Sequence, residues 1–435
     1  MGDFASIYHH FLEGGRVPVF DGAIGTMLQR YPELKAVHFG EELNLSHPKL
    51  VQEIHRAYFE AGADFITTNT FSANRLRLSK AGLGERVEEI NIRAVELARA
   101  ATEGKSYVAG SIGPIGSLMT PLGSLTFSEA EKAFMEQAQA LQRGGADLII
   151  IETMAHPREI KAAIAAVRNK TTLPLIASMT FSAHGRTIYG TSPKTATNLL
   201  ESLGVDVIGA NCSVGPWELL KVAEVYHRST KLPILIEPNA GQPRLVHGRT
   251  VYDVGPEEFA QAMNKMLELG IDIIGSCCGS DPSYTRKLRE LALGFTPQER
   301  SWSHLPQISS RTKVVSLEEA LQHWDDVPEI VVRGGIHELR AVSQGEAPLI
   351  VLNLRGMKAG EMEEFERAFL QAQILTDKPF GFRVANAIIL ERCLQATEGI
   401  PLVILEPEDK GELQEMERLV NRYGGVIVKI QAGFT

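Results

Sequence analysis

Three of the four cysteines in this chain have types and spacing that could hold a metal ion: Cys212, Cys277 and Cys278. The last two are neighbours in a Gly-Ser-Cys-Cys-Gly segment, which suits ordinary disulfide geometry poorly. A single free cysteine is usually a buried, inert side chain. Three thiols at predicted strand ends instead match a catalytic zinc site, which uses three protein ligands and keeps a fourth position open. Sulfur ligands also favour zinc over magnesium or calcium.

Three thiolates would give bound zinc a net negative charge, so we expect the centre to activate water poorly. It suits a second thiol better, because a thiol that coordinates zinc loses its proton at neutral pH. The predicted reaction is attack by a substrate thiolate on an electrophilic carbon. Cys212, Cys277 and Cys278 are therefore the predicted catalytic residues as well as the metal ligands.

Polar and small residues at the other predicted strand ends indicate an amino-acid substrate. Asp21 and Glu152 could hold its ammonium group, and the backbone N–H groups of Gly22 and Ala23 could hold its carboxylate. The simpler interpretation of each carboxylate is a helix cap or a loop-fixing hydrogen bond, and Asn69 could be only a turn former. The predicted substrate-binding residues are Asp21, Gly22, Ala23, Asn69, Glu152, Glu237 and Asn239.

Eight short, apolar runs predict the strands that carry these residues: 17–21, 64–70, 107–113, 148–154, 173–181, 205–213, 232–239 and 271–279. Amphipathic stretches of helical length lie between them, including 48–61, 85–102, 128–143 and 256–269, and Ser128 is the expected cap of the third. Runs that are apolar throughout are typical of parallel strands covered on both faces. Eight such units over about 250–300 residues predict an α/β fold, the (β/α)8 TIM barrel. A doubly wound sheet is disfavoured because the first turn, 21–25, lacks the GxGxxG spacing.

The length of 435 residues exceeds what one hydrophobic core usually organises, so two domains are expected. We predict a barrel over 1–295, a linker over 296–313 where the periodicity is lost, and a smaller α/β domain over 314–435. In the latter, strands are expected at 329–332, 348–354, 379–384, 401–405 and 426–430, and helices at 361–375, 385–396 and 412–423.

The overall composition excludes several classes of protein. A net charge of -9 with interspersed acids and bases gives no basic patch for nucleic acid. No apolar run is long enough to cross a membrane, so we expect no membrane partner. Four cysteines in so long a chain indicate a reducing, cytoplasmic location rather than a disulfide scaffold.

Six segments closely resemble motifs of the homocysteine S-methyltransferase family, in the correct order over about residues 10 to 295. They are Asp21-Gly22-Ala23-Ile24-Gly25-Thr26, Thr68-Asn69-Thr70-Phe71, Glu152-Thr153, Gly209-Ala210-Asn211-Cys212-Ser213, Glu237-Pro238-Asn239-Ala240-Gly241 and Gly275-Ser276-Cys277-Cys278-Gly279. Within that family they are most similar to the N-terminal homocysteine-binding module of cobalamin-dependent methionine synthase.

The resemblance implies a TIM barrel and a zinc ion held by Cys212, Cys277 and Cys278. It also implies that Asp21 and Glu152 hold homocysteine, and that Asn239 could serve as a weak fourth ligand without substrate. The expected activity is zinc-dependent methyl transfer to the homocysteine thiol, giving methionine.

The C-terminal domain only faintly resembles part of the folate-binding (pterin-binding) barrel of methionine synthase, and it departs from that pattern. Val351 stands where an Asp would precede Asn353, Arg383 stands where an acid is expected, and no cobalamin-binding Asp-x-His-x-x-Gly segment occurs. We therefore expect a degenerate, partial and non-catalytic domain, with the methyl group carried as methylcobalamin on a separate corrinoid protein. The domain would dock that protein or a second copy of this chain, as a homo-oligomer, or would be a structural appendage.

Two other functions remain open from the sequence. One is a homocysteine methyltransferase that uses S-methylmethionine, S-adenosylmethionine or betaine as its methyl donor. The other is a non-catalytic zinc-binding partner subunit. Asp21 and Glu152 argue against the second, because a purely structural zinc would be closed by a fourth protein ligand.

Overall fold

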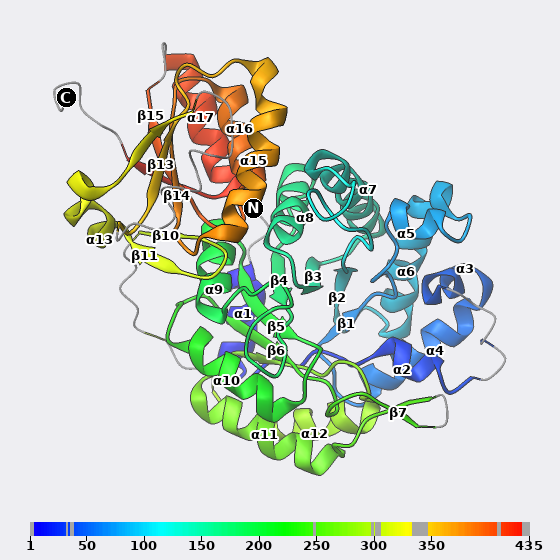
Figure 1. Cartoon of the computed structure of the whole chain (residues 1–435). Coiled ribbons are helices and arrows are strands. Elements are labelled where there is room, and N and C mark those ends of the chain that lie inside the picture. The colour runs from blue at the N-terminus through cyan, green and yellow to red at the C-terminus, as the bar shows by residue number, and fades with distance from the viewer. Residues whose placement is uncertain are drawn as a thin grey trace.

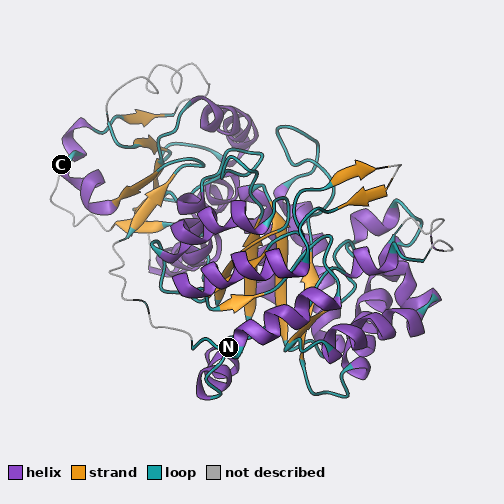
Figure 2. Cartoon of the chain, turned by 90° about the horizontal axis from the view of Figure 1, so that it is seen from below, coloured by secondary structure: helices purple, strands orange, loops and turns teal. Residues whose placement is uncertain are grey.

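The computed structural model describes residues 4–31, 34, 39–246, 249–296, 300, 306–332, 347–406 and 410–428. Its larger part is a curled parallel sheet whose strands are surrounded by helices (Figures 1 and 2). The sheet consists of β1 (Phe65–Thr67), β2 (Tyr107–Ile112), β3 (Leu148–Met154), β4 (Leu175–Met179), β5 (Val207–Asn211), β6 (Ile234–Glu237) and β9 (Ile273–Ile274), in that order.

The two edges of this sheet are joined by the predicted first strand, which is reduced to two bridging residues. Val19 forms a parallel bridge to Ile274 of β9, and Phe20 forms one to Phe65 of β1. The backbone N–H of Phe20 donates to the Ile274 carbonyl at 2.8 Å, and that of Asp21 donates to the Phe65 carbonyl at 3.1 Å. All eight predicted runs therefore contribute to one closed arrangement, as the (β/α)8 prediction requires.

The longer helices cover the outer face of the sheet with their apolar stripes, and the helices of four or five residues lie in the connections and contact other helices. The helices of both kinds are α2 (Ile24–Leu28), α3 (Leu43–Ser46), α4 (Pro48–Glu60), α5 (Arg75–Ser79), α6 (Val87–Ala101), α7 (Phe127–Gly144), α8 (Pro157–Lys170), α9 (Pro193–Ser202), α10 (Pro216–His227), α11 (Pro256–Leu269) and α12 (Pro282–Ala292). The expected cap at Ser128 is wrong: Thr126 caps α7, since its hydroxyl accepts from the Glu129 N–H while the Glu129 carboxylate accepts from the Thr126 N–H.

A four-fold repeat of Gly-x-Asp sets the strand register at the amino ends of the strands. The repeats are Gly62-Ala63-Asp64, Gly145-Ala146-Asp147, Gly204-Val205-Asp206 and Gly270-Ile271-Asp272, and each glycine has a positive φ after a helix. The aspartates accept at 2.7–3.0 Å from the backbone N–H groups of Val19, Val108, Leu175 and Ile234, each in the neighbouring strand. An aspartate of this kind thus stands before every second strand of the sheet and binds the neighbouring strand. These hydrogen bonds fix the register of the strands, whose opposite ends carry the site.

Helix α1 (Phe4–Glu13) packs against the amino ends of the strands. Its Phe4 and Phe11 are buried in the same apolar cluster as Phe20 and Phe65, and the Phe11 and Phe65 ring centroids lie 5.7 Å apart. The opposite, carboxyl end of the sheet is therefore the accessible one. Among the described residues, no helix is both long and apolar enough to cross a membrane.

The C-terminal part contains a second parallel sheet with strands adjacent in chain order: β12 (Glu329–Val331), β13 (Ile350–Asn353), β14 (Phe380–Val384), β15 (Leu402–Leu405) and β16 (Val426–Val428). Its helices are α13 (Leu317–Gln322), α15 (Met362–Leu375), α16 (Ala387–Ala396) and α17 (Lys410–Tyr423). All five predicted strands are found, although residues 429–430 of the last lie outside the described residues. The sequential order is that of a segment of a barrel; the pterin-binding resemblance stays a prediction.

The predicted linker contains a strand. Within 296–313, β10 (Gln307–Ser309) pairs antiparallel with β11 (Val314–Ser316), and Ser309 also bridges Ile400 of the C-terminal sheet. Residues 297–299 and 301–305 of the predicted linker lie outside the described residues. The three domain boundaries therefore remain predictions, with β10 better grouped with the part that follows.

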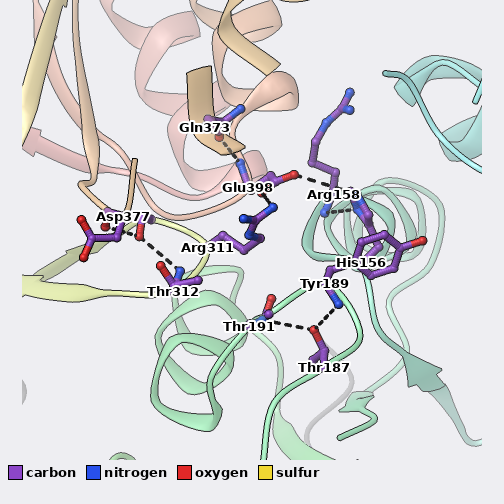
Figure 3. Close-up of polar contacts among 12 residues, drawn as sticks. His156, Arg158, Thr187, Tyr189, Thr191, Arg311, Thr312, Gln373, Asp377 and Glu398 are labelled. Carbon is purple, nitrogen blue, oxygen red and sulfur yellow. Dashed lines mark hydrogen bonds and ion pairs between the residues drawn. The ribbon is translucent and has the colours of Figure 1, made fainter. Parts of the chain in front are cut away.

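The two parts pack through α8 and α9 of the barrel: α8 contacts α16 and α17, and α9 contacts β10 and β11 (Figure 1). Lys161 of α8 is fully buried, and its ammonium donates to the carbonyls of Leu394, Thr397 and Gly399 at 3.0, 3.0 and 3.3 Å. These carbonyls lie at and just beyond the end of α16, where backbone acceptors lack partners within the helix. Nearby, Glu398 lies between Arg311 and His156, at 3.5 and 4.0 Å (Figure 3).

Candidate active site

The three predicted metal ligands converge at the carboxyl ends of the barrel strands. Each sulfur of Cys212, Cys277 and Cys278 lies within 4.8 Å of the other two, and the Cys212 and Cys278 sulfurs are 3.8 Å apart. All three cysteines are free thiols. Hydrogen bonds from Cys212 and Cys277 lower the pKa of the Cys278 thiol, so a thiolate is stabilised there.

Backbone hydrogen bonds between loops hold the cysteines in place. The Cys212 N–H donates to the Glu237 carbonyl at 3.0 Å, and the Cys277 N–H donates to the Pro238 carbonyl at 2.8 Å. Cys212 has φ of +60°, a left-handed conformation that residues other than glycine seldom adopt. The sulfurs are thus positioned by segments that bind one another directly, with backbone strain at the strand end.

The cysteines line a cavity of about 450 Å³ into which Asp21 and Glu152 also face. Asp21 accepts from the Thr67 N–H at 2.9 Å, and Glu152 accepts from the Ser111 hydroxyl at 2.6 Å. Burial raises the pKa of Asp21 to about 8 and that of Glu152 to about 7. Both carboxyls are therefore poised to ionise when a cation enters the cavity.

Gly22 and Ala23 line the same cavity, and their role in holding a substrate carboxylate stays a prediction. The Ala23 N–H already donates to the Ser280 hydroxyl at 3.3 Å, which makes it a poorer donor to a substrate carboxylate. A Cβ atom at Gly22 would lie 2.7 Å from the Ser280 Oγ and 2.9 Å from the Tyr58 ring. Glycine is needed at this position because neighbouring side chains leave no room for a larger residue.

The other three predicted residues divide between the cavity and its surroundings. Asn69 lines the cavity. Its amide donates to the Gly40 carbonyl at 2.8 Å and to Asn44 at 3.0 Å, and these bonds hold the segment that contains Gly40 at the cavity. Glu237 lines it too, and burial, with Glu152 and Asp21 nearby, raises its pKa well above the usual range. Asn239 is buried but is not part of the cavity lining, and its Oδ1 has no hydrogen-bond partner among the residues that the structure describes.

Sequence reasoning missed two residues that organise the site. The Asn211 amide lies 2.8 Å from the Thr153 hydroxyl, 3.4 Å from Glu152 and 3.9 Å from the Cys277 sulfur, and its Oδ1 accepts from the Thr153 N–H at 2.8 Å. Tyr252 lines the cavity, and its hydroxyl hydrogen-bonds the Cys278 thiol. Asn211 was recognisable from its position beside Cys212, whereas nothing in the sequence around Tyr252 indicates the contact.

The donor set fits a thiophilic metal ion. Three thiols from two segments converge on one point beside a cavity, and sulfur ligands in this number are typical of zinc. Asn239 Oδ1, buried and without a partner, is an oxygen donor on the segment that hydrogen-bonds to the cysteine loops. The residues therefore fit a zinc ion with three protein sulfurs.

The model of the homocysteine S-methyltransferase family matches residues 18–292. The chain is 34% identical over 313 residues to methionine synthase of Mycobacterium tuberculosis and 33% over 318 residues to that of Mycobacterium leprae. Each match covers 68% of this chain and 26% of the relative, so the chain spans about a quarter of the length of these relatives.

Solved structures with the same barrel include the homocysteine methyltransferase MmuM from Escherichia coli. Its metallated form has a TM-score of 0.55 and 23% identity, over 64% of this chain and 97% of that chain. Its oxidised form has a TM-score of 0.54 at the same identity. The likeness to MmuM supports a common fold, and the family match extends over most of the barrel with all three cysteines inside it. The chain belongs to the homocysteine S-methyltransferase family.

Proposed function

We propose that this protein transfers a methyl group to the thiol of homocysteine and so produces methionine, with zinc held by Cys212, Cys277 and Cys278. The observation that carries the proposal is the convergence of three free sulfurs within 4.8 Å beside a cavity of about 450 Å³. Zinc, when bound, would cause the substrate thiol to lose its proton at neutral pH.

The chain's own residues would bind and orient the amino acid. Asp21 and Glu152 offer two buried carboxyls for one ammonium group, and a cation would favour their ionised forms. Glu237, with its pKa well above the usual range, would remain protonated and could donate a hydrogen bond. Holding the thiol and the methyl donor in line provides most of the remaining catalysis.

Asn211 and Tyr252 would act on the sulfurs. The Asn211 amide, at 3.9 Å from the Cys277 sulfur, and the Tyr252 hydroxyl both direct N–H or O–H dipoles at thiolates. Such donors stabilise negative charge on a metal-bound sulfur and hold its orientation. Asn239 Oδ1 would be the weak fourth ligand that homocysteine replaces.

We infer that the methyl group arrives as methylcobalamin on a separate corrinoid protein. Polar side chains of the C-terminal sheet, where a folate would be expected to bind, pair with one another. Arg383 contacts Glu329 at 3.1 Å and Glu406 at 2.8 Å, and the Asn353 amide donates to Glu329 at 2.7 Å. A folate site there would require these pairs to break, so this part would instead dock a partner, a second copy, or serve structure alone.

A panel of methyl donors tests the proposal on zinc-loaded full-length protein with homocysteine. Methylcobalamin bound to a corrinoid protein should give methionine, whereas S-methylmethionine, S-adenosylmethionine and betaine should not. Turnover with one of those three would favour the MmuM-like alternative. A protein that binds zinc yet turns over none of the donors would favour a non-catalytic zinc subunit.

The free cysteine thiols also indicate the cell compartment in which the protein works. All four cysteines are unpaired, including buried Cys393 in α16. A zinc site of three thiols needs a reducing compartment, and we therefore keep the cytoplasm as the proposed location.

A further inference from the structure

A second cavity, of about 690 Å³, lies between the barrel and the C-terminal part. The barrel contributes the loop before α7, the first residues of α7, and Arg158 of α8. The C-terminal part contributes α15 and α16, with Leu370 and Ala396 among the apolar residues. This volume falls in the range of small-molecule sites, which occur preferentially at domain interfaces.

Arg158 places a buried positive charge at this cavity. The residue is 4% exposed, yet no carboxylate of the described residues forms an ion pair with it within 4.0 Å. Its Nε donates to the Gln395 carbonyl at 3.0 Å and its Nη1 to the Thr120 carbonyl at 2.5 Å. Nη2 donates to no group among the described residues, and the side chain extends away from the His156–Glu398 pair (Figure 3).

A buried guanidinium without a carboxylate is costly. Consistent with this, burial lowers the pKa of Arg158 to about 10. Glu398 and Glu366 favour the charged form of Arg158 from a greater distance, but the other charged residues of the cavity form their ion pairs with one another. Arg392 and Glu366 form two hydrogen bonds of 2.6 Å, and Arg367 lies 3.5 Å from Glu363. One positive charge is therefore left over in the cavity lining.

The amino end of α7 opens onto the same cavity. Thr126, Phe127 and Ser128 line it, and the capping hydroxyl of Thr126 satisfies only the Glu129 N–H. The N–H groups of Phe127 and Ser128 donate to no group among the described residues. The first N–H groups of an 18-residue helix carry its partial positive charge and commonly bind anions.

We propose that this cavity binds a small organic anion, whose carboxylate or phosphate group lies between Arg158 and the amino end of α7. Its apolar body would contact Pro121, Leu370 and Ala396. Because the walls come from both parts of the chain, the ligand would bind them together and stabilise their packing. The site is separate from the cysteine cavity, since the two share no lining residue.

Two probes test the proposal and separate the two anion chemistries: inorganic phosphate and glutarate. Binding to the full chain is measured by titration calorimetry and by thermal unfolding, with chloride added so that ionic strength is constant. At least one probe should bind and raise the unfolding midpoint by about 2 °C or more at saturation. Phosphate alone would identify a phosphate ligand, and glutarate alone a carboxylate.

Ser128→Asp supplies the decisive variant, because an acid in the first turn suits the helix while repelling an anion in the cavity. It should weaken binding about tenfold or more relative to the neutral Ser128→Asn protein, which has a side chain of the same size. Arg158→Gln should weaken binding as well. The proposal fails if neither probe binds, or if the Ser128→Asp protein binds as tightly as the Ser128→Asn protein.

Discussion

The sulfurs of Cys212 and Cys278 lie 3.8 Å apart although 66 residues separate them in the chain. They meet because β5 and β9 flank β6, and the loops after these strands are joined by backbone hydrogen bonds. In a parallel sheet the carboxyl ends of neighbouring strands lie at one edge, so the sheet itself brings the thiols together.

The metal site predicts a sharp difference between cysteines. Cys277→Ser should lower the bound zinc from one ion per chain to a small fraction and reduce methyl transfer about a hundredfold or more, since a ligand is lost. Zinc content and turnover are measured on the same preparation. Cys393→Ser is the matched control: Cys393 lies buried in α16, away from the cluster, and should leave zinc bound. Equal zinc content in both variants would contradict the assignment.

The affinity for homocysteine should increase with pH. Asp21 has a pKa of about 8 in the free protein, and an ammonium group binds only its ionised form well. Binding therefore releases protons, and KM should fall as the pH rises from about 6 to about 8. Asp21→Asn should raise KM and weaken this dependence, and Glu152, with a pKa of about 7, would account for the dependence that remains. A KM that is constant over this range in the unaltered protein would exclude the role of Asp21.

Asn211 should be important for stability as well as for activity. Asn211→Ala removes the acceptor of the Thr153 N–H, and Thr153 has φ of +60°. We expect the free energy of unfolding to fall by about 1–3 kcal/mol, measured by urea denaturation, together with a lower kcat. Asn169→Ala, at an exposed position of α8, is the control and should change neither. Unaltered kcat in a folded Asn211→Ala protein would limit its role to structure.

Lys161 should hold the two parts of the chain together. Lys161→Met would leave three carbonyls at the end of α16 without their donor and should cost about 2–3 kcal/mol of stability. Limited proteolysis should then release the C-terminal part earlier than in the unaltered protein. Lys170→Met, an exposed change on the same helix, should behave normally. If both variants resisted proteolysis as the unaltered protein does, other contacts would be the main ones that hold the two parts of the chain together.

The same lysine predicts a pH dependence of stability. Burial lowers the pKa of Lys161 to about 7, below its unfolded value. The unfolded chain then binds more protons between these values, so this group's contribution to stability should rise as the pH increases from about 7 to about 10. The slope is measured by comparing denaturation midpoints of the unaltered and Lys161→Met proteins, and it should be smaller in the variant.

The sequence predicted the strands well because their apolar runs are buried on both faces and leave little choice of structure. β3 was expected at 148–154 and is found at Leu148–Met154. The run at 17–21 was less accurate, since only Val19 and Phe20 form bridges. The Gly-x-Asp repeat is also visible in the sequence. Its role depends on which strand each aspartate contacts, and the local sequence does not show which strands are neighbours.

The sequence by itself determined which residue types stand at strand ends, and hence that Cys212, Cys277 and Cys278 could meet. The tertiary structure decided which backbone groups are already engaged: the Ala23 N–H by Ser280, and the Asn69 amide by Gly40 and Asn44. It also brought Tyr252 beside Cys278 and left Arg158 without an ion pair among the described residues. These contacts depend on distances between segments that are remote in the sequence. The packing of the folded chain determines those distances, and the local sequence does not.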